Sequence, residues 1–368
     1  MSSVLKRIEK SLRIPLYKFA TLFVSKKEAT LPLDGNKMKR ILLIRDDRVG
    51  DMVVTLPTIQ FLKDTFPHLD IDVLCSPSNI SVLQGNPHIH IAYILPKNKI
   101  RRLIFLRSLR QNDYDCIIPL VFLKKSRYGF FSQLIQTKNT ITVIFEPNNK
   151  PIYTPIFSIL AFINFGSYTM NEILLRWCCL LFGIPFNSKY TTVPFHIPKL
   201  STKKAKEFIV QNQIQKPILI YNISASENIR QLTEQTHIEV IEGLLQVLPH
   251  FHIVLLFIQK DRITVDKMNA QFTNKISIFE PTTVIFDTIA LIELSSIVIS
   301  PNTAITHISA ALDKPLLSIQ SYHTTTEWRP KHSQYRIVSP KESLEVSSIS
   351  SEEILLEFSQ LTQEFLQT

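Results

Sequence analysis

The chain has 368 residues, of which 45% are hydrophobic and 20% are charged, a balance that excludes a disordered protein. Its length exceeds the usual size of a single hydrophobic core, so we expect two domains. Lysine and arginine outnumber aspartate and glutamate by 41 to 31, a net charge of +10, which suits an anionic partner without identifying it.

Residues 1–37 have a basic, amphipathic pattern. Apolar side chains recur at helical spacing with basic side chains between them: Val4, Leu5, Ile8, Leu12, Leu16, Phe19 and Phe23, with Lys6, Arg7, Lys10, Arg13 and Lys18. Such a helix binds an anionic membrane surface or packs on the protein's own core, and the sequence leaves both readings open. No stretch of the chain reaches the roughly 20 apolar residues of a membrane-spanning helix.

Residues 38–190 alternate short apolar runs with helical patterns. Strands are predicted over residues 41–44, 71–75, 91–95, 116–120 and 140–145, and helices over 52–66, 99–111 and 170–182. Gly183 and Pro185 end the last of these helices. The polar, lysine-rich stretch 187–204 is predicted to connect this domain to the next.

Residues 191–340 repeat the alternation. Strands are predicted over residues 218–221, 252–258, 276–279, 297–299 and 316–319, and helices over 237–248, 286–295 and from 303 to before Pro315. The remainder, residues 341–368, contains a helix that a capping box at Ser350 and Glu353 opens. Strands alternating with helices indicate an α/β fold, here two Rossmann-like, doubly wound domains.

The cysteines and histidines point to no metal site. Cys75, Cys116, Cys178 and Cys179 lack zinc-ligand spacing, and the histidines are scattered. We recognise no secretory signal, so we expect a cytoplasmic protein with buried, reduced thiols.

The loop that follows the first strand, Arg45 to Asp51, carries unusual residues. Ligands of open α/β sheets bind at the carboxyl ends of strands, and Asp51 lies there, close to the start of a helix. Its carboxylate is either a helix cap or a general base. The loop is not Gly-x-Gly-x-x-Gly, and no Walker sequence occurs, which weakens dinucleotide and P-loop interpretations.

Two loops of the second domain are candidate phosphate sites. Residues 301–307 place small polar side chains at a helix N-terminus, which is a diphosphate site or an ordinary cap with His307 packed inward. Residues 222–230 supply hydroxyls and Arg230, which bind phosphate oxygens or simply form a solvated loop.

Two long blocks resemble glycosyltransferase family 9, the bacterial lipopolysaccharide heptosyltransferases. They are ILLIRDDRVGDMVVTLPTIQFLKDTFPHLDIDVL, residues 41–74, and DTIALIELSSIVISPNTAITHISAALDKPLLSI, residues 287–319. Shorter stretches, residues 106–119 and 171–183, fit further landmarks of the family. The resemblance implies a GT-B architecture, two Rossmann-like domains that face one another across a cleft. It also implies inverting heptose transfer from ADP-heptose to the Kdo–lipid A region of lipopolysaccharide, with no metal and no cofactor beyond this nucleotide-sugar co-substrate.

The resemblance also implies roles for individual residues. Asp51 falls on the catalytic base. The donor-binding positions, for diphosphate and sugar, are Ser224, Ser226, Arg230, Asn302, Thr303, Ala304 and His307. Residues 38–190 would form the acceptor domain. The cations expected to bind the anionic core of the acceptor lipopolysaccharide are Arg48, Arg101, Arg102, Lys124, Lys125 and Arg127. The alternative for these basic residues is a solvated face. An acceptor in a membrane would explain peripheral contact with the inner membrane, made by the basic N-terminal segment.

The sequence departs from the family pattern at the donor loop. Asn302 stands where most members have Asp, and Ala304 where most have Gly, so a different donor is conceivable. Asp70 and Asp72 form a DxD, the cation-binding pattern of another glycosyltransferase class, but they lie at the start of a strand, and we interpret them as structural.

Two alternatives stay open. One is another enzyme of the same architecture, a transferase with a different nucleotide sugar or a sugar-nucleotide epimerase. The other is a non-enzymatic basic protein that binds membrane or nucleic acid. Nothing in the sequence resembles a nucleic-acid motif, and aromatic residues do not interleave the basic clusters, so no nucleic-acid partner is expected.

Overall fold

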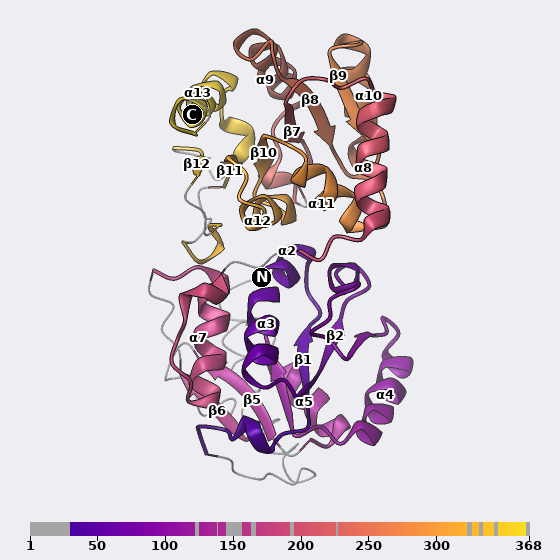
Figure 1. Cartoon of the computed structure of the whole chain (residues 1–368), viewed down its shortest axis with the longest axis vertical. Helices are drawn as coiled ribbons and strands as arrows, with labels where there is room; N and C mark the ends of the chain where they lie inside the picture. Colours follow the sequence, from indigo (N-terminus) through magenta and orange to yellow (C-terminus); the bar gives the residue numbers. More distant parts are fainter. Residues whose placement is uncertain are drawn as a thin grey trace, which may run out of the picture. The chain divides into compact units, whose positions relative to one another are not determined.

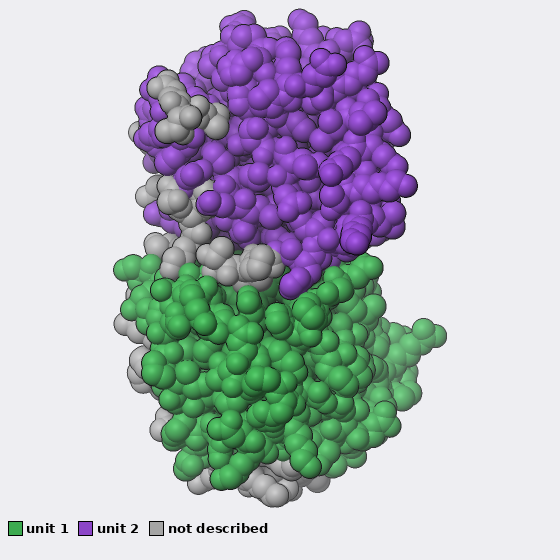
Figure 2. Space-filling view, in the orientation of Figure 1, with its two compact units in different colours: residues 1–191 green, residues 192–368 purple. Residues whose placement is uncertain are grey.

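The computed structural model describes residues 30–121, 125–137, 139–144, 157–162, 167–191, 195–225, 227–321, 326–330, 334–341 and 345–365. Residues 1–29 of the predicted N-terminal segment lie outside these ranges, as do Lys124 and Ser226, and so does the side chain of Lys125. The chain divides into two compact units, residues 1–191 and 192–368, which Figure 2 distinguishes by colour.

Unit 1 contains a sheet of six parallel strands in the order β3-β2-β1-β4-β5-β6. The strands are β1 (Arg40–Arg45), β2 (Asp70–Cys75), β3 (Ile91–Ile94), β4 (Cys116–Pro119), β5 (Asn139–Ile144) and β6 (Ile159–Phe162). β1 pairs Arg45 with Cys75 of β2 and Ile44 with Pro119 of β4. The apolar runs predict these central strands because a parallel sheet covered on both faces buries every side chain.

Helices cover both faces of this sheet (Figure 1). They are α2 (Val49–Val53), α3 (Leu56–Thr65), α4 (Lys99–Ser108), α5 (Lys125–Ile135) and α7 (Met170–Phe182). Leu42 and Ile44 of β1 pack with α4 and α5, whereas Ile41 and Leu43 point to the opposite face. α3 and α7 pack against each other, and Gly183 ends α7 in the left-handed conformation, φ 64°, as predicted.

Unit 2 contains a second six-stranded parallel sheet, in the order β12-β11-β10-β7-β8-β9. The strands are β7 (Ile218–Asn222), β8 (His252–Leu256), β9 (Ile276–Phe279), β10 (Ile297–Pro301), β11 (Leu316–Ile319) and β12 (Tyr335–Val338). Read from each unit's own first strand, both sheets have the order 3-2-1-4-5-6 of the Rossmann fold.

The helices of unit 2 are α8 (Lys199–Gln211), α9 (Glu234–Val247), α10 (Arg262–Gln271), α11 (Ile285–Glu293), α12 (Ala304–Ala311) and α13 (Ser351–Phe365). α13 packs on α9 and adds Ile354, Phe358 and Leu361 to the core of unit 2. The predicted capping box is present, since Glu353 N–H donates to Ser350 Oγ and Ser350 N–H donates to the Glu353 carboxylate, both at 3.2 Å. The C-terminal helix is therefore part of unit 2 and not an appendage.

Two predicted elements are corrected by the structure. The helix expected over residues 52–66 is two helices, α2 and α3, because Pro57 has no N–H to donate to the carbonyl of Val53. The connection expected over residues 187–204 ends earlier, since α8 begins at Lys199, directly after Pro198. A proline suits the start of a helix, where no intrahelical N–H donor is needed.

Five elements escaped prediction: α5, β6, α8, α10 and β12. α5 and α8 begin in lysine-rich sequence, and α10 has the polar sequence RITVDKMNAQ. α5 nevertheless buries Tyr128, Phe131 and Ile135 at helical spacing, a signal that the basic residues before them obscure. β6 and β12 are four-residue strands at the edges of their sheets.

Asp72, the second aspartate of the DxD pattern, is fully buried within β2. Tyr114 OH donates to Asp72 Oδ2 at 2.6 Å, the backbone N–H of Ile91 donates to Oδ1 at 3.1 Å, and His90 Nδ1 lies 2.9 Å from Oδ1. Both carboxylate oxygens thus bond to protein groups, which lie at the start of β3 and in the segment before β4. The carboxylate has a structural role.

The cysteines are buried thiols, as the sequence predicts. All four cysteines are buried and unpaired, and burial raises the pKa of the Cys179 thiol to about 11, so the thiol form dominates at neutral pH. In the part of the chain that the structure describes, every helix is too short or too polar to cross a membrane.

Replacement of Tyr114 by phenylalanine should destabilise unit 1 by about 1–3 kcal/mol, because Asp72 Oδ2 would lose its donor inside the protein. Urea unfolding followed by intrinsic fluorescence measures the change. Tyr93→Phe is the matched control: its hydroxyl accepts from Asn112 and contacts no carboxylate of the network, so the cost should be smaller. Equal costs for the two variants would contradict the role of the Asp72 bond.

Candidate active site

The strand order reverses direction between β1 and β4 in unit 1 and between β7 and β10 in unit 2. Loops at the carboxyl ends of such strands diverge and leave a crevice, where α/β proteins bind ligands. In unit 1 these loops begin at Asp46 and Leu120, and in unit 2 at Ile223 and Asn302. The three loops that the sequence singles out all lie at these two positions.

Asp51 is the third residue of α2, and Arg48 is the N-cap residue. The Asp51 side chain is 15% exposed, and its Oδ1 lies 3.2 Å from Nη2 of Arg45. Arg45 Nε also donates to the Asp51 carbonyl at 2.9 Å, and Thr55 Oγ1 donates to the same carbonyl at 2.8 Å. The carboxylate is therefore held by an arginine of β1 and still reaches solvent.

Arg45 is the residue that joins the two loops of unit 1. It is 1% exposed, and besides Asp51 its guanidinium contacts the carbonyl of Leu120, directly after β4, through Nη1. This role of Arg45 is not among those that the sequence predicts. The available signal was an arginine at the last position of an otherwise apolar, buried strand, where a charge requires a partner.

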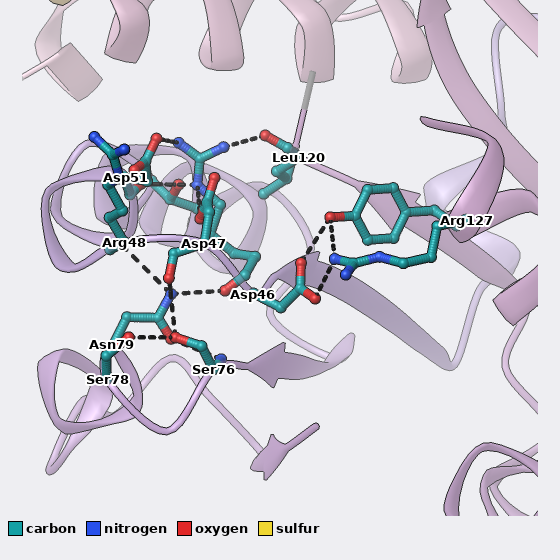
Figure 3. A network of polar contacts seen from close by, with 12 residues as sticks. Asp46, Asp47, Arg48, Asp51, Ser76, Ser78, Asn79, Leu120 and Arg127 are labelled. Carbon is teal, nitrogen blue, oxygen red and sulfur yellow. Dashed lines mark hydrogen bonds and ion pairs between the residues drawn. The ribbon is translucent and has the colours of Figure 1, made fainter. Parts of the chain in front are cut away.

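The loop after β2 braces the turn between β1 and α2 (Figure 3). Asn79 is fully buried, its Nδ2 donates to the carbonyl of Arg45 at 2.8 Å, and its Oδ1 accepts the N–H of Ser76 at 2.9 Å. Ser76 Oγ donates to the carbonyl of Asp47 at 3.0 Å. Asn79 also escaped prediction, because the sequence Ser-Pro-Ser-Asn reads as an ordinary polar turn.

Asp46 and Arg127 form a second ion pair beside the first. Arg127 Nη2 lies 2.5 Å from Asp46 Oδ2, and Tyr128 OH donates to Oδ1 at 2.7 Å. The Asp46 side chain is 4% exposed and that of Arg127 is 35% exposed. Arg127, predicted to bind an anionic acceptor, thus has its charge balanced by Asp46, which reduces the net attraction that it offers to an anion.

Three more of the predicted acceptor cations are among the described residues, Arg48, Arg101 and Arg102. Arg48 is exposed at the start of α2, and Arg101 is exposed in the first turn of α4. Arg102 is half-buried, and its guanidinium donates to the carbonyls of Pro96 and Lys97 at 2.8 and 2.9 Å. Arg102 therefore anchors the start of α4.

Asp47 is the acid of this loop that is least well paired. Its Oδ1 is 3.4 Å from Arg45 Nε and accepts no hydrogen bond from any described residue. Burial raises the pKa of the Asp47 carboxyl to about 7; Arg45 opposes this rise, and the negative charges of Asp51 and Asp46 add to it.

In unit 2, Asn222 links the two strands of the switch point. Its Nδ2 donates to Ser300 Oγ at 2.9 Å and to Thr303 Oγ1 at 3.3 Å. Thr303 is the N-cap of α12, and its Oγ1 accepts the N–H of Ile305 at 3.3 Å. The predicted donor loop is thus a capped helix N-terminus, in which Ala304 is the first helical residue.

His307 lies on α12, 9% exposed, with its ring 6.1 Å from the ring of Trp328. Asn302 donates its backbone N–H to the carbonyl of Ile319 at 2.9 Å, which fixes the backbone between β10 and α12. These contacts place both residues at the switch point of unit 2.

Ser224 and Arg230, predicted to contact phosphates, have partners within the protein. Ser224 is 3% exposed; its Oγ donates to Asp261 Oδ2 at 2.5 Å and accepts the N–H of Ile258 at 3.0 Å. Arg230 Nε lies 3.4 Å from Glu227 Oε2. Asp261 escaped prediction; it lies in the loop after β8, and Gln231 donates to its Oδ1 at 2.9 Å, so it orders the loop after β7.

The Asp47 carboxyl should make stability depend on pH. Its pKa is raised in the folded state, so its ionisation costs stability progressively as pH rises from about 4 to about 7, and the full cost remains above that range. Asp47→Asn should therefore raise the thermal midpoint relative to the wild type more at pH 8 than at pH 5. Asp64→Asn, at an exposed position of α3, is the control, and the same pH trend in both variants would refute the assignment to Asp47.

Comparison with known proteins identifies the family. The model of glycosyltransferase family 9 (heptosyltransferase) matches residues 167–354, just over half of the chain. Lipopolysaccharide heptosyltransferase 3 of Escherichia coli K12 is 24% identical over 291 residues, 76% of this chain and 82% of that protein.

Two solved structures share the fold. The family 9 glycosyltransferase of Veillonella parvula DSM 2008 covers 91% of this chain and 100% of its own, with a TM-score of 0.73 and 15% identity. The E. coli ADP-heptose lps heptosyltransferase II covers 88% and 99%, with a TM-score of 0.69 and 16% identity. The chain has the GT-B fold of these proteins, and it belongs to glycosyltransferase family 9 (heptosyltransferase).

Proposed function

We propose that this glycosyltransferase transfers a heptose from ADP-heptose to the inner core of lipopolysaccharide, with inversion at the anomeric carbon and with Asp51 as general base. The observation that carries the proposal is the Asp51 carboxylate, partly exposed at the switch point of unit 1 and oriented by buried Arg45. The names of relatives from E. coli supply the donor and the acceptor.

The proposed reaction needs a base on the acceptor side. As the acceptor oxygen attacks the anomeric carbon, its proton passes to the Asp51 carboxylate, and the bond from that carbon to the diphosphate oxygen breaks. Arg45 and Thr55 hold the backbone and side chain of Asp51, so the base is positioned before the substrate arrives. ADP leaves with the bonding electrons, and the product is a glycoside of opposite anomeric configuration.

The leaving diphosphate needs positive charge, which unit 2 supplies in this proposal. The N-terminus of α12, at Thr303 and Ala304, carries the positive end of the helix dipole. Arg230 adds a guanidinium that an incoming diphosphate would compete for against Glu227. These groups would stabilise the leaving group without a metal ion. The reaction would take place in the cytoplasm or at the cytoplasmic face of an inner membrane.

The identity of the donor nucleotide can be tested, because the donor loop departs from the family pattern at Asn302. Asn302 is neutral where most family members carry an acid, so its amide can still bond to a sugar hydroxyl but cannot act as a base. Thermal-shift measurements with ADP, UDP, GDP and CMP should show the largest stabilisation with ADP, and transfer with ADP-heptose should follow. A larger shift with UDP or GDP would reject the adenine donor and favour another nucleotide sugar.

Asp51→Asn should lower kcat by about 10²–10⁴-fold, the usual contribution of general base catalysis. The affinity for ADP should stay within about twofold, since Asp51 is not among the residues proposed to bind the diphosphate. Asp64→Asn, on the exposed side of α3, should keep the wild-type rate. Wild-type turnover by Asp51→Asn would remove Asp51 from the mechanism and leave the donor assignment standing.

A further inference from the structure

α4 presents an unusual face to solvent. Its inner side packs on the sheet, where Leu106 is buried in the core of unit 1 and Phe105 stacks edge-on against Tyr93 of β3 at 5.9 Å. Figure 1 shows α4 on the flank of the sheet of unit 1. The opposite side of a flanking helix is expected to be polar.

That outer side is apolar instead. Ile100 is 71% exposed, Ile104 is 64% exposed and Leu103 is 39% exposed. Residues three and four positions apart lie on the same side of a helix, so these three side chains form one continuous patch. Other exposed aliphatic residues on the described helices, such as Val210 of α8 and Ile263 of α10, do not form such a group of three.

The charged residues on the patch's own stretch of chain are all basic. Residues 97–112 contain no aspartate or glutamate. The exposed cations of this stretch are Lys97, Lys99, Arg101, Arg107 and Arg110. At 100° per residue, Arg107 projects between Leu103 and Ile100, and Lys99 and Arg101 lie at the two margins of the apolar patch.

This combination of aliphatic and cationic side chains fits an anionic bilayer. Aliphatic side chains enter the boundary between headgroups and acyl chains, while lysine and arginine contact the anionic headgroups. A second copy of the same face would bring two sets of cations together, which electrostatic repulsion opposes.

We propose that the outer face of α4, formed by Ile100, Leu103 and Ile104 with Lys99 and Arg107, docks unit 1 on an anionic lipid bilayer. The docking does not depend on the transfer reaction, and it assigns membrane contact to a described helix, independently of the prediction for residues 1–37.

The first test is flotation of the full chain with vesicles of phosphatidylcholine that contain about 30% phosphatidylglycerol. Ile100→Ser/Ile104→Ser should weaken binding by about tenfold or more, since it removes the two most exposed aliphatic side chains. The matched control is Val210→Ser/Ile263→Ser, which removes equally exposed aliphatic side chains from unit 2 and should stay within about twofold of the wild type.

A second test separates charge from apolar insertion. Lys99→Gln/Arg107→Gln should weaken binding to the anionic vesicles, and the wild type should bind vesicles of phosphatidylcholine alone less tightly. An environment-sensitive fluorophore on Ile104→Cys should shift to the blue with anionic vesicles, whereas the same label on Ile263→Cys should not. The native cysteines are buried, so labelling should favour the introduced thiol.

Three outcomes would overturn the proposal. One is undiminished vesicle binding by the Ile100→Ser/Ile104→Ser variant, which would assign the membrane contact to another segment. Another is an absence of any fluorophore shift at position 104. The third is a wild-type dimer that this variant converts to a monomer in light scattering, which would make the patch a contact between copies of the chain.

Discussion

The buried guanidinium of Arg45 is the interaction on which the site of unit 1 depends. A charge removed from water is costly unless it is paired and hydrogen-bonded, and Arg45 is 1% exposed. Its partners are the carboxylate and carbonyl of Asp51 and the carbonyl of Leu120. Because these partners lie after β1 and after β4, the hydrogen bonds of this one guanidinium hold the loops on both sides of the switch point and orient the proposed base.

The same loop concentrates three aspartates, and the structure gives each a different environment. Asp46 binds Arg127 and Tyr128, Asp51 binds Arg45, and Asp47 has only a longer contact with the same arginine. One guanidinium cannot balance two neighbouring carboxylates equally. Burial and the negative charges of Asp51 and Asp46 therefore raise the pKa of the Asp47 carboxyl to about 7. The backbone carbonyl of Asp47 accepts a hydrogen bond from Ser76.

The fold class and the location of the candidate loops could be predicted from the amino-acid sequence alone. Runs such as residues 41–44 and 297–299 are short, continuous and apolar, which is typical of a strand covered on both faces. Since ligands bind where parallel strands end, the residues that follow these runs were identifiable without a structure. The family resemblance then favoured Asp51 as a base over Asp51 as a cap, a choice that spacing alone left open.

The pairing of those residues follows from the fold and from no local pattern. Arg127 and Asp46 are far apart in sequence, as are Ser224 and Asp261, so no local pattern shows that a predicted anion-binding group already has an acid beside it. Exposure is likewise a tertiary property: the spacing of Ile100, Leu103 and Ile104 predicts a helix face, but packing through Leu106 decides that this face meets solvent. Periodicity reports which side chains share a side of a helix, and only the fold determines which side is covered.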